Sequence, residues 1–231
     1  MATVTHTAQF VERTPHAGAS ERQVLRLSDV DWDGYLTVQK VFDRQRGFRL
    51  AYDRGELEIM SPTLAHDDDS RFLGDLVRVG ARAARLPSRR GGSVTMRTEL
   101  LQKGIEPDDC FWIQNADRVA GARELDLDVL PPPDLGIEVD VSRSSLNRFS
   151  IYAALRIAEI WRLEGDTLTF CLLTDRGEYV PAPASRALPH LPPDDVMRFV
   201  HEGRVAVDQG EVLDQFREWY REFLAGIESG E

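Results

Sequence analysis

Lysine is nearly absent from this chain of 231 residues, because Lys40 and Lys103 are the only lysines among its 28 basic residues. Site chemistry that needs a lysine therefore has almost no candidates. Positive charge has to come from arginine, whose pKa above about 12 makes it a poor general base. Acids outnumber bases, 39 to 28, and leave a net charge of -11. This balance argues against a protein that coats nucleic acid nonspecifically, but it is compatible with a local basic groove.

Cysteine and long apolar runs are also scarce. Cys110 and Cys171 lie in apolar, strand-like runs without a CxxC motif or a Cys/His partner at zinc-ligand spacing, which predicts reduced core thiols. No apolar run approaches the roughly 18 residues that a membrane helix needs. The first residues lack a basic segment followed by a hydrophobic one. We therefore expect no membrane association and a cytoplasmic location.

The composition is that of a globular protein, with 42% hydrophobic and 29% charged residues. Residues 1–22 mix small, polar and charged side chains without periodicity, which predicts a flexible N-terminal tail. No linker-like stretch interrupts residues 23–231, so these are expected to form a single domain.

Alternating and helical periodicities predict a mixture of strands and helices. Residues 48–52 and 56–60 alternate around Asp53-Arg54-Gly55, which predicts an N-terminal hairpin. Apolar spacings of three and four residues predict helices near 66–85 and 146–157. Further strands are predicted near residues 94–101, 108–113, 136–141 and 159–163. The first two of these are expected to pair as an antiparallel hairpin, and the fold class is α/β (α+β).

Two acid-bearing strands are candidates for chemistry. Residues 136–141 alternate apolar side chains with Glu138 and Asp140, and the run over 105–113 opens with acids that include Asp108. If these strands are neighbours, Asp108 and Glu138 converge, and converging carboxylates bind the kind of hard cation used to attack a phosphodiester. The plainer interpretation is that Glu138 and Asp140 form the polar side of a half-exposed strand. A glycosidase-like carboxylate pair is a third alternative, which leaves the arginines described next without a role.

An arginine stripe follows the predicted helix near 66–85. Between residues 71 and 97 there are seven arginines and one acid, Asp75. Arg78, Arg82 and Arg85 follow helical spacings and are our candidate nucleic-acid contacts. The alternative is a solvated helix face whose arginine stems lie on the core.

Several short motifs of this chain follow one another in an order that is typical of one protein family. They are Gly55-Glu56-Leu57-Glu58-Ile59-Met60-Ser61-Pro62, His66, Glu106-Pro107-Asp108, Asp134-Leu135, Glu138-Val139-Asp140, Ile151-Tyr152 and Glu159-Ile160-Trp161. This series resembles the Uma-type family of restriction endonucleases, which is placed in the PD-(D/E)XK nuclease superfamily. The resemblance covers about residues 28 to 225. It implies a restriction-endonuclease-like mixed central sheet flanked by helices, with the predicted hairpin at its N-terminal side.

The resemblance also implies roles for individual residues. Asp108 and Glu138 correspond to the ligands of a divalent metal ion, Mg2+ or Mn2+, and no small-molecule cofactor is expected. The superfamily's lysine, two residues after the glutamate, is here Asp140, which is expected to aid the metal directly or through water. Arg148 on the following helix takes the place of the basic residue and would neutralise charge on the phosphate.

Two functional hypotheses follow. The first is a metal-dependent DNA endonuclease with Asp108, Glu138, Asp140 and Arg148 at its catalytic site. DNA would be its partner, and a homodimer is expected because two-fold pairs commonly cut both strands of a duplex. The second is a catalytically degenerate nuclease fold that acts as a nucleic-acid or protein interaction module. The missing lysine favours the second hypothesis, whereas the intact Asp108 and Glu138 favour the first.

Overall fold

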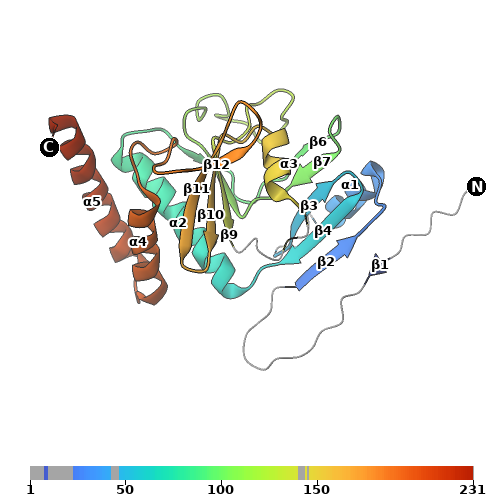
Figure 1. Ribbon diagram of the computed structural model, residues 1–231, viewed down its shortest axis with the longest axis horizontal. Coiled ribbons are helices and arrows are strands. Elements are labelled where there is room, and N and C mark those ends of the chain that lie inside the picture. Colours follow the sequence, from blue (N-terminus) through green and yellow to red (C-terminus); the bar gives the residue numbers. More distant parts are fainter. Residues whose placement is uncertain (1–7, 10–22, 43–46, 140–143, 145, 231) are drawn as a thin grey trace, which may run out of the picture.

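The computed structural model describes residues 8–9, 23–42, 47–139, 144 and 146–230, and its strands form two sheets (Figure 1). The first sheet contains β1 (Ala8–Gln9), β2 (Gln23–Leu27), β3 (Arg49–Asp53), β4 (Glu56–Ser61), β6 (Met96–Thr98) and β7 (Lys103–Ile105). The second contains β5 (Arg89–Arg90), β8 (Asp109–Trp112), β9 (Leu135–Val139), β10 (Glu159–Glu164), β11 (Thr167–Leu173) and β12 (Tyr179–Ala182). The described helices are α1 (Trp32–Phe42), α2 (Leu64–Ala83), α3 (Arg148–Ala154), α4 (Pro193–Val205) and α5 (Gln209–Ser229).

The first sheet has the order β1-β2-β4-β3-β7-β6, and all of its neighbouring strands are antiparallel. The predicted N-terminal hairpin is confirmed as β3 and β4, which close at the pair Asp53 and Glu56. Gly55 in the connecting turn has φ 99, a left-handed conformation that glycine adopts without strain. Helix α1 covers this sheet by stacking Tyr35 on Tyr52, with ring centroids 4.6 Å apart.

The second sheet has the order β12-β11-β10-β9-β8-β5 and is mixed. Strands β9 and β10 are parallel, with α3 as the crossover between them, whereas β8 and β9 are antiparallel. The prediction that the strands near Asp108 and Glu138 are neighbours is therefore confirmed. The expected fold class, a mixed α/β arrangement with flanking helices, is confirmed.

Two details of the predicted sheet are wrong. The strands form two sheets rather than one, and β6 pairs with β7 in the first sheet rather than with β8. The physical reason lies in Glu106-Pro107-Asp108, which separates β7 from β8. Proline has no backbone N–H for a sheet ladder, so the strand ends there and the chain passes from the first sheet to the second.

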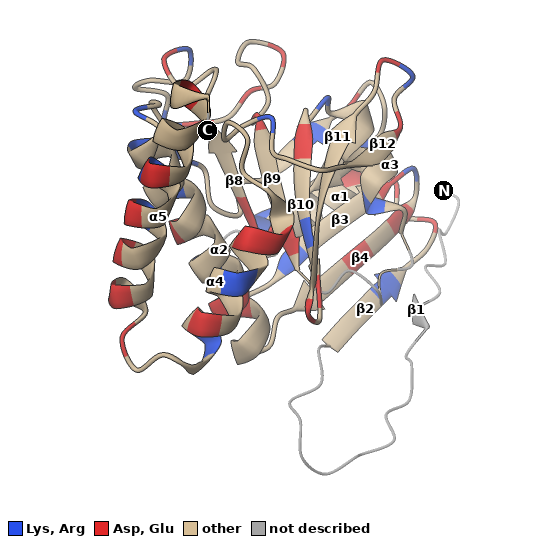
Figure 2. Cartoon of the chain, turned by 60° about the vertical axis from the view of Figure 1, so that its left-hand side comes forward, with Lys and Arg blue, Asp and Glu red and all other residues tan. Residues whose placement is uncertain are grey.

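Helices α2, α4 and α5 cover one side of the second sheet. Helix α2, predicted near 66–85, packs on β8 and β9, α4 packs on β11, and α5 packs on α2 and α4. The side chain of Thr63 caps α2 by accepting a hydrogen bond from the backbone N–H of His66 at 3.3 Å. Figure 2 marks several acidic residues along one edge of α5.

Helix α3 lies between the two sheets and is shorter than the predicted helix near 146–157. Asn147 caps it by accepting a hydrogen bond from the N–H of Ser150 at 3.1 Å. Its buried Ile151 and Tyr152 share one apolar cluster with Ile105 of the first sheet and Ile160 of the second. The residue that opens this helix, Arg148, is consequently held between the sheets.

The predicted tail over residues 1–22 lies outside the described residues, apart from β1, which pairs with β2. The division into a tail and one domain stays a prediction. Among the described helices, none combines the length and the apolar character needed to cross a membrane.

Two glycine-to-alanine substitutions should have opposite effects on stability. A Cβ at Gly203 in α4 would lie 2.3 Å from the Phe72 ring, so Gly203→Ala should lower the free energy of unfolding by about 1–3 kcal/mol. A Cβ at Gly226 in α5 would meet no atom within 4 Å, so Gly226→Ala should raise it by up to about 1 kcal/mol through helix propensity. Urea unfolding measures both values, and a loss of stability in Gly226→Ala would contradict the described packing.

Candidate active site

Strand register places Asp108 opposite Glu138. Asp109 pairs with Ile137 in the antiparallel ladder of β8 and β9, and the backbone N–H of Asp108 continues that ladder by donating to the carbonyl of Ile137 at 3.2 Å. Residues directly opposite one another in an antiparallel pair extend their side chains to the same side of the sheet. The two carboxylates are therefore neighbours, as the sequence predicted, and both are buried.

Glu138 is held by two residues of α3. The guanidinium of Arg148 donates to it through Nε at 2.9 Å and through Nη2 at 2.8 Å, and Nη2 also donates to the carbonyl of Glu106 at 3.1 Å. The hydroxyl of Tyr152, one helical turn beyond Arg148, donates to the same carboxylate. Burial raises the pKa of Glu138, and the negative charge of Asp108 adds to this, against the opposing effect of Arg148.

Asp108 is held by a different set of partners. Its Oδ2 accepts the backbone N–H of Val139 at 2.9 Å and lies 3.2 Å from Nε2 of His66. Nε2 also lies 3.0 Å from the carbonyl oxygen of Val139, and since both neighbours are acceptors, Nε2 must carry the proton. Burial acts to raise the pKa of Asp108, but the hydrogen bond and charge of His66, followed by the charge of Arg148, outweigh burial and lower this pKa.

The second carboxylate oxygen of Asp108, Oδ1, has no hydrogen-bond donor among the described residues. It is buried, and Nε of Arg49 in β3 lies 3.8 Å away. Arg49, Arg71 and Glu106 line a hollow of about 500 Å³ that Asp108 itself does not line. Arg49 therefore separates Asp108 from this hollow. On the other side of the site, Glu138 and Arg148 line a smaller pocket of about 140 Å³.

Three contributors to the site were not assigned a role from the sequence, namely His66, Arg49 and Tyr152. The four-residue spacing of Arg148 and Tyr152 on one helix was a usable signal. His66 belongs to a motif of the resemblance, but its contact with Asp108 joins residues 42 positions apart. Arg49 comes from the first sheet, and only the packing of the two sheets brings it to Asp108. The predicted site residue Asp140 lies outside the described residues.

The available metal ligands are few. Among the residues that the structure describes, no three His, Cys, Asp or Glu side chains are arranged to hold a metal ion. Asp108 and Glu138 do offer hard oxygen donors, and the buried Oδ1 of Asp108 accepts no hydrogen bond. Both oxygens of Glu138 accept hydrogen bonds from Arg148, so Oδ1 of Asp108 is the free donor, and Glu138 joins it only if Arg148 releases one oxygen. Magnesium keeps several waters and commonly takes only one or two protein carboxylates, and this donor set fits such an ion on that condition.

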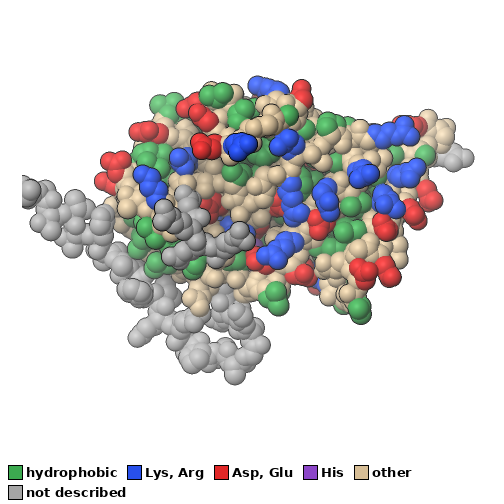
Figure 3. Space-filling model, turned by 180° about the vertical axis from the view of Figure 1, so that it is seen from behind, with side chains coloured by type: hydrophobic (Ala, Val, Ile, Leu, Met, Phe, Trp, Pro, Cys, Tyr) green, Lys and Arg blue, Asp and Glu red, His purple; other side chains and the backbone are tan. Residues whose placement is uncertain are grey.

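The predicted nucleic-acid residues lie at the far end of α2. Arg78, Arg82 and Arg85 line a hollow of about 680 Å³ together with Arg217 of α5, which the sequence did not suggest. We name this group the arginine hollow. Arg82 follows His66 by 16 residues, which places it about 24 Å from the Asp108 end of the helix at about 1.5 Å per residue. Figure 3 shows that many lysine and arginine side chains, with acidic ones among them, lie on the face of the molecule seen from behind.

Comparison with known proteins agrees with the motifs. The Uma2 family, whose description is "Putative restriction endonuclease", matches residues 32–222, which confirms the resemblance inferred from the sequence. A crystal structure described as a "putative nuclease belonging to DUF820" from Anabaena variabilis is 15% identical, with a TM-score of 0.47. That match covers 65% of this chain and 90% of the Anabaena chain. No curated protein matches the sequence.

Removing the partner of Glu138 should cost stability. Arg148→Ala leaves a buried carboxylate without its counter-charge, so we expect the free energy of unfolding to fall by about 3–5 kcal/mol at neutral pH. Adding Glu138→Gln to this variant should recover part of the loss, because the unpaired buried charge is then absent. Urea unfolding measures both effects, with the exposed Arg118→Ala as a control expected within about 0.5 kcal/mol of the parent. A loss below about 1 kcal/mol for Arg148→Ala would mean that this pair is not buried in solution.

Proposed function

Because the chain belongs to the Uma2 family, described as "Putative restriction endonuclease", we propose that it is a metal-dependent endonuclease that hydrolyses phosphodiester bonds in DNA. The observation that carries the proposal is the strand register that sets Asp108 beside Glu138. Paired carboxylates at a strand edge are able to hold a hard cation against a phosphate. We expect the protein to act without a small-molecule cofactor.

In this proposal Asp108 and Glu138 hold Mg2+ or Mn2+, with Asp140 assisting directly or through water. The bound ion would supply Lewis-acid stabilisation of charge on the phosphate. Oδ1 of Asp108 is available for such a ligand, since no described residue donates to it. His66 orients Asp108 through Oδ2 and leaves Oδ1 uncommitted.

Arg148 is the proposed phosphate-neutralising residue. It is the fully charged group closest to Glu138, and its pKa is raised because the charge of Glu138 outweighs the effect of burial. An arginine in this position stabilises anionic charge but does not remove a proton from water. Neither lysine is proposed for that task, because Lys40 is on α1 and Lys103 pairs with Asp53 at 2.7 Å.

A second candidate function has a specific observation in its favour. Both carboxylates are buried and already have polar partners, Glu138 in an ion pair with Arg148 and Asp108 beside Nε2 of His66. A site satisfied in this way is also what a catalytically degenerate nuclease fold would contain. Such a protein would bind nucleic acid or another protein through its surface without cleaving a phosphodiester.

The metal proposal is tested by cleavage and by thermal stability. Mg2+ or Mn2+ should raise the melting temperature of the parent by mass action and support nicking of supercoiled DNA. Asp108→Asn should lose both effects, whereas Asp175→Asn, an exposed acid outside the site, should keep both. Linear product would indicate paired copies that cut both strands, while open circles alone indicate single-strand cutting. DNA binding without any metal-dependent shift or nicking would favour the interaction module.

The duplex is proposed to lie along α2, away from the acidic edge of α5 (Figure 2). The distance of about 24 Å from the site to the arginine hollow corresponds to about seven base steps of 3.4 Å, so one duplex is long enough to reach both. Arg82 and Arg85 form no ion pair with a described residue, and Arg78 lies 3.5 Å from Asp75. The charges of Arg82 and Arg85 are therefore available for phosphates.

Removing charge from the arginine hollow should weaken duplex binding. The double variant Arg78→Ala/Arg82→Ala should bind more weakly at every sequence, and the slope of log affinity against log salt should fall by about one for each lost phosphate contact. Fluorescence anisotropy over a salt series measures both quantities. Arg176→Ala/Arg186→Ala removes two exposed arginines that do not line the hollow and should leave the slope unchanged. Equal slopes in the two double variants would show that the arginine stripe is an ordinary solvated helix face that does not contact phosphates.

A further inference from the structure

A second recess lies against the face of β8 that also carries Asp108, four residues further along at Trp112, because alternate residues of a strand share a face. It has a volume of about 150 Å³ and an apolar interior formed by Val94, Trp112, Val119, Leu125 and Leu130. We name it the Trp112 pocket. The recess is open to solvent and its wall is partly polar, and a volume of this size is enough for one aromatic ring such as that of benzene.

The aromatic wall of the pocket is fixed in place. Nε1 of Trp112 donates to the carbonyl of Pro131 at 2.9 Å, which uses the only polar atom of the indole. A Cβ at Gly91 would lie 2.6 Å from Sγ of Cys110 and 2.7 Å from Cζ3 of Trp112, so only glycine allows the chain to pass this close to the ring. The pocket can therefore engage a ligand through ring contact with Trp112, but not through the indole N–H.

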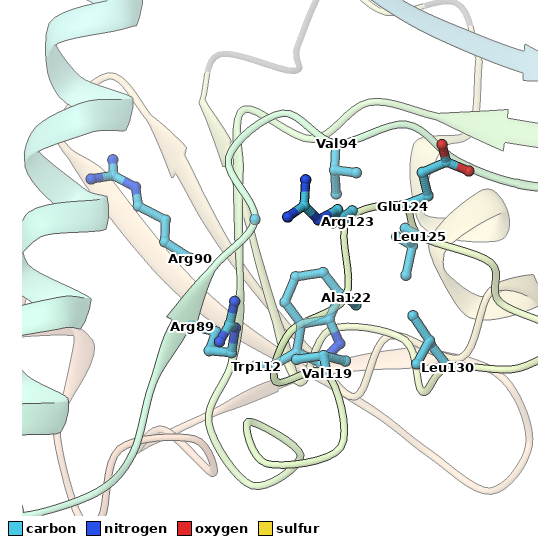
Figure 4. Close-up of a pocket in the computed structure, with 11 residues that line it drawn as sticks. Arg89, Arg90, Val94, Trp112, Val119, Ala122, Arg123, Glu124, Leu125 and Leu130 are labelled. Carbon is cyan, nitrogen blue, oxygen red and sulfur yellow. The ribbon is translucent and has the colours of Figure 1, made fainter.

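The pocket also carries positive charge that the fold does not use. Arg89 and Arg123 line it, both are exposed, and neither forms an ion pair with a described residue. Figure 4 shows Arg89 to the left of the Trp112 ring and Arg123 above it, with Leu125 and Leu130 to its right; Glu124 at the upper right is the one acid of the lining. Arg90 is turned away from the centre, because its guanidinium pairs with Asp109 at 2.6 Å and Asp75 at 2.9 Å. In a chain with a net charge of -11, two unpaired arginines beside an aromatic ring favour an anion with an aromatic body.

The pocket adjoins the hollow beside Arg49. Val94 lines both the Trp112 pocket and the hollow that Arg49 separates from Asp108. Trp112 follows Asp108 by four residues along β8, which is about 13 Å at about 3.3 Å per residue. A few nucleotides of one strand span that distance at about 3.4 Å per base step.

We infer that the Trp112 pocket holds one unpaired pyrimidine base of a DNA strand bound at the candidate active site, with neighbouring phosphates against Arg89 and Arg123. A base inside a duplex cannot enter such a recess, so the base has to be single-stranded or extruded from the helix. Its single ring matches the cavity, and ring contact with Trp112 provides the affinity that single-strand sites commonly use. This inference rests on the proposed function and specifies its substrate as DNA with an unpaired base near the cut.

Binding of matched oligonucleotides without metal tests the inference. In EDTA, a labelled thymidine oligonucleotide should bind the parent at least about fivefold more tightly than an abasic strand of the same length and charge. Ala122→Trp, which fills the pocket from its exposed rim, should abolish this preference, whereas Ala120→Trp in the same loop but outside the pocket should keep it. Arg89→Ala and Arg123→Ala should weaken binding of both strands, in contrast to Arg118→Ala.

Tryptophan fluorescence gives an independent reading of the site. The thymidine strand should quench emission in the parent more than the abasic strand does, and Trp112→Phe should remove that difference while retaining a ring in the pocket. Equal affinity for the two strands, or an undiminished preference in a folded Ala122→Trp, would overturn the inference and assign the pocket to another occupant. Nicking without any base preference would support the proposed function but contradict the inference that the Trp112 pocket holds a base. A base preference without metal-dependent nicking would support base binding in the Trp112 pocket but contradict the proposed nuclease activity.

Discussion

The buried ion pair between Glu138 and Arg148 is the interaction on which the arrangement of the two sheets depends. Glu138 belongs to the second sheet, and Arg148 opens the helix that lies between the sheets. The same guanidinium reaches the carbonyl of Glu106, at the point where the chain crosses from one sheet to the other. Burying two charges is costly unless both are fully hydrogen-bonded, and here the bidentate contact, the carbonyl and Tyr152 meet that condition. The same ion pair therefore stabilises the packing of the two sheets and forms part of the candidate active site.

The scarcity of lysine has a visible structural consequence. Charge around the two carboxylates comes from Arg148, Arg49 and His66, which arrive from three different elements. The two carboxyl groups consequently differ: burial raises the pKa of Glu138, whereas His66 and Arg148 overcome burial and lower that of Asp108. Groups of one chemical type acquire different proton affinities when their surroundings differ in this way.

Charge is distributed unevenly over the surface of this acidic chain. Acidic residues lie along one edge of α5, while many arginines lie on the face seen from behind and at the Trp112 pocket (Figures 2 and 3). A polyanion is repelled by the first surface and attracted to the second, so a negative net charge is compatible with an oriented approach of nucleic acid. The hollow beside Arg49 and the Trp112 pocket are neighbours, because Val94 lines both.

The sequence by itself determined the features that depend on local pattern. Alternation predicted β3, β4, β9 and β10, apolar spacing predicted α2, and the acids Asp108 and Glu138 stood out on neighbouring runs. The motif order identified the family as well. These signals are readable because side-chain periodicity is a property of a few consecutive residues.

Tertiary structure alone decided how distant segments meet. It divided the strands into two sheets at Pro107, brought Arg49 and His66 to Asp108, and placed Arg217 beside the arginines of α2. These contacts join residues far apart in the chain, and no local periodicity encodes which surfaces will pack together. The Trp112 pocket is hidden from the sequence for the same reason, because its walls come from β5, β8 and the long loop that precedes β9.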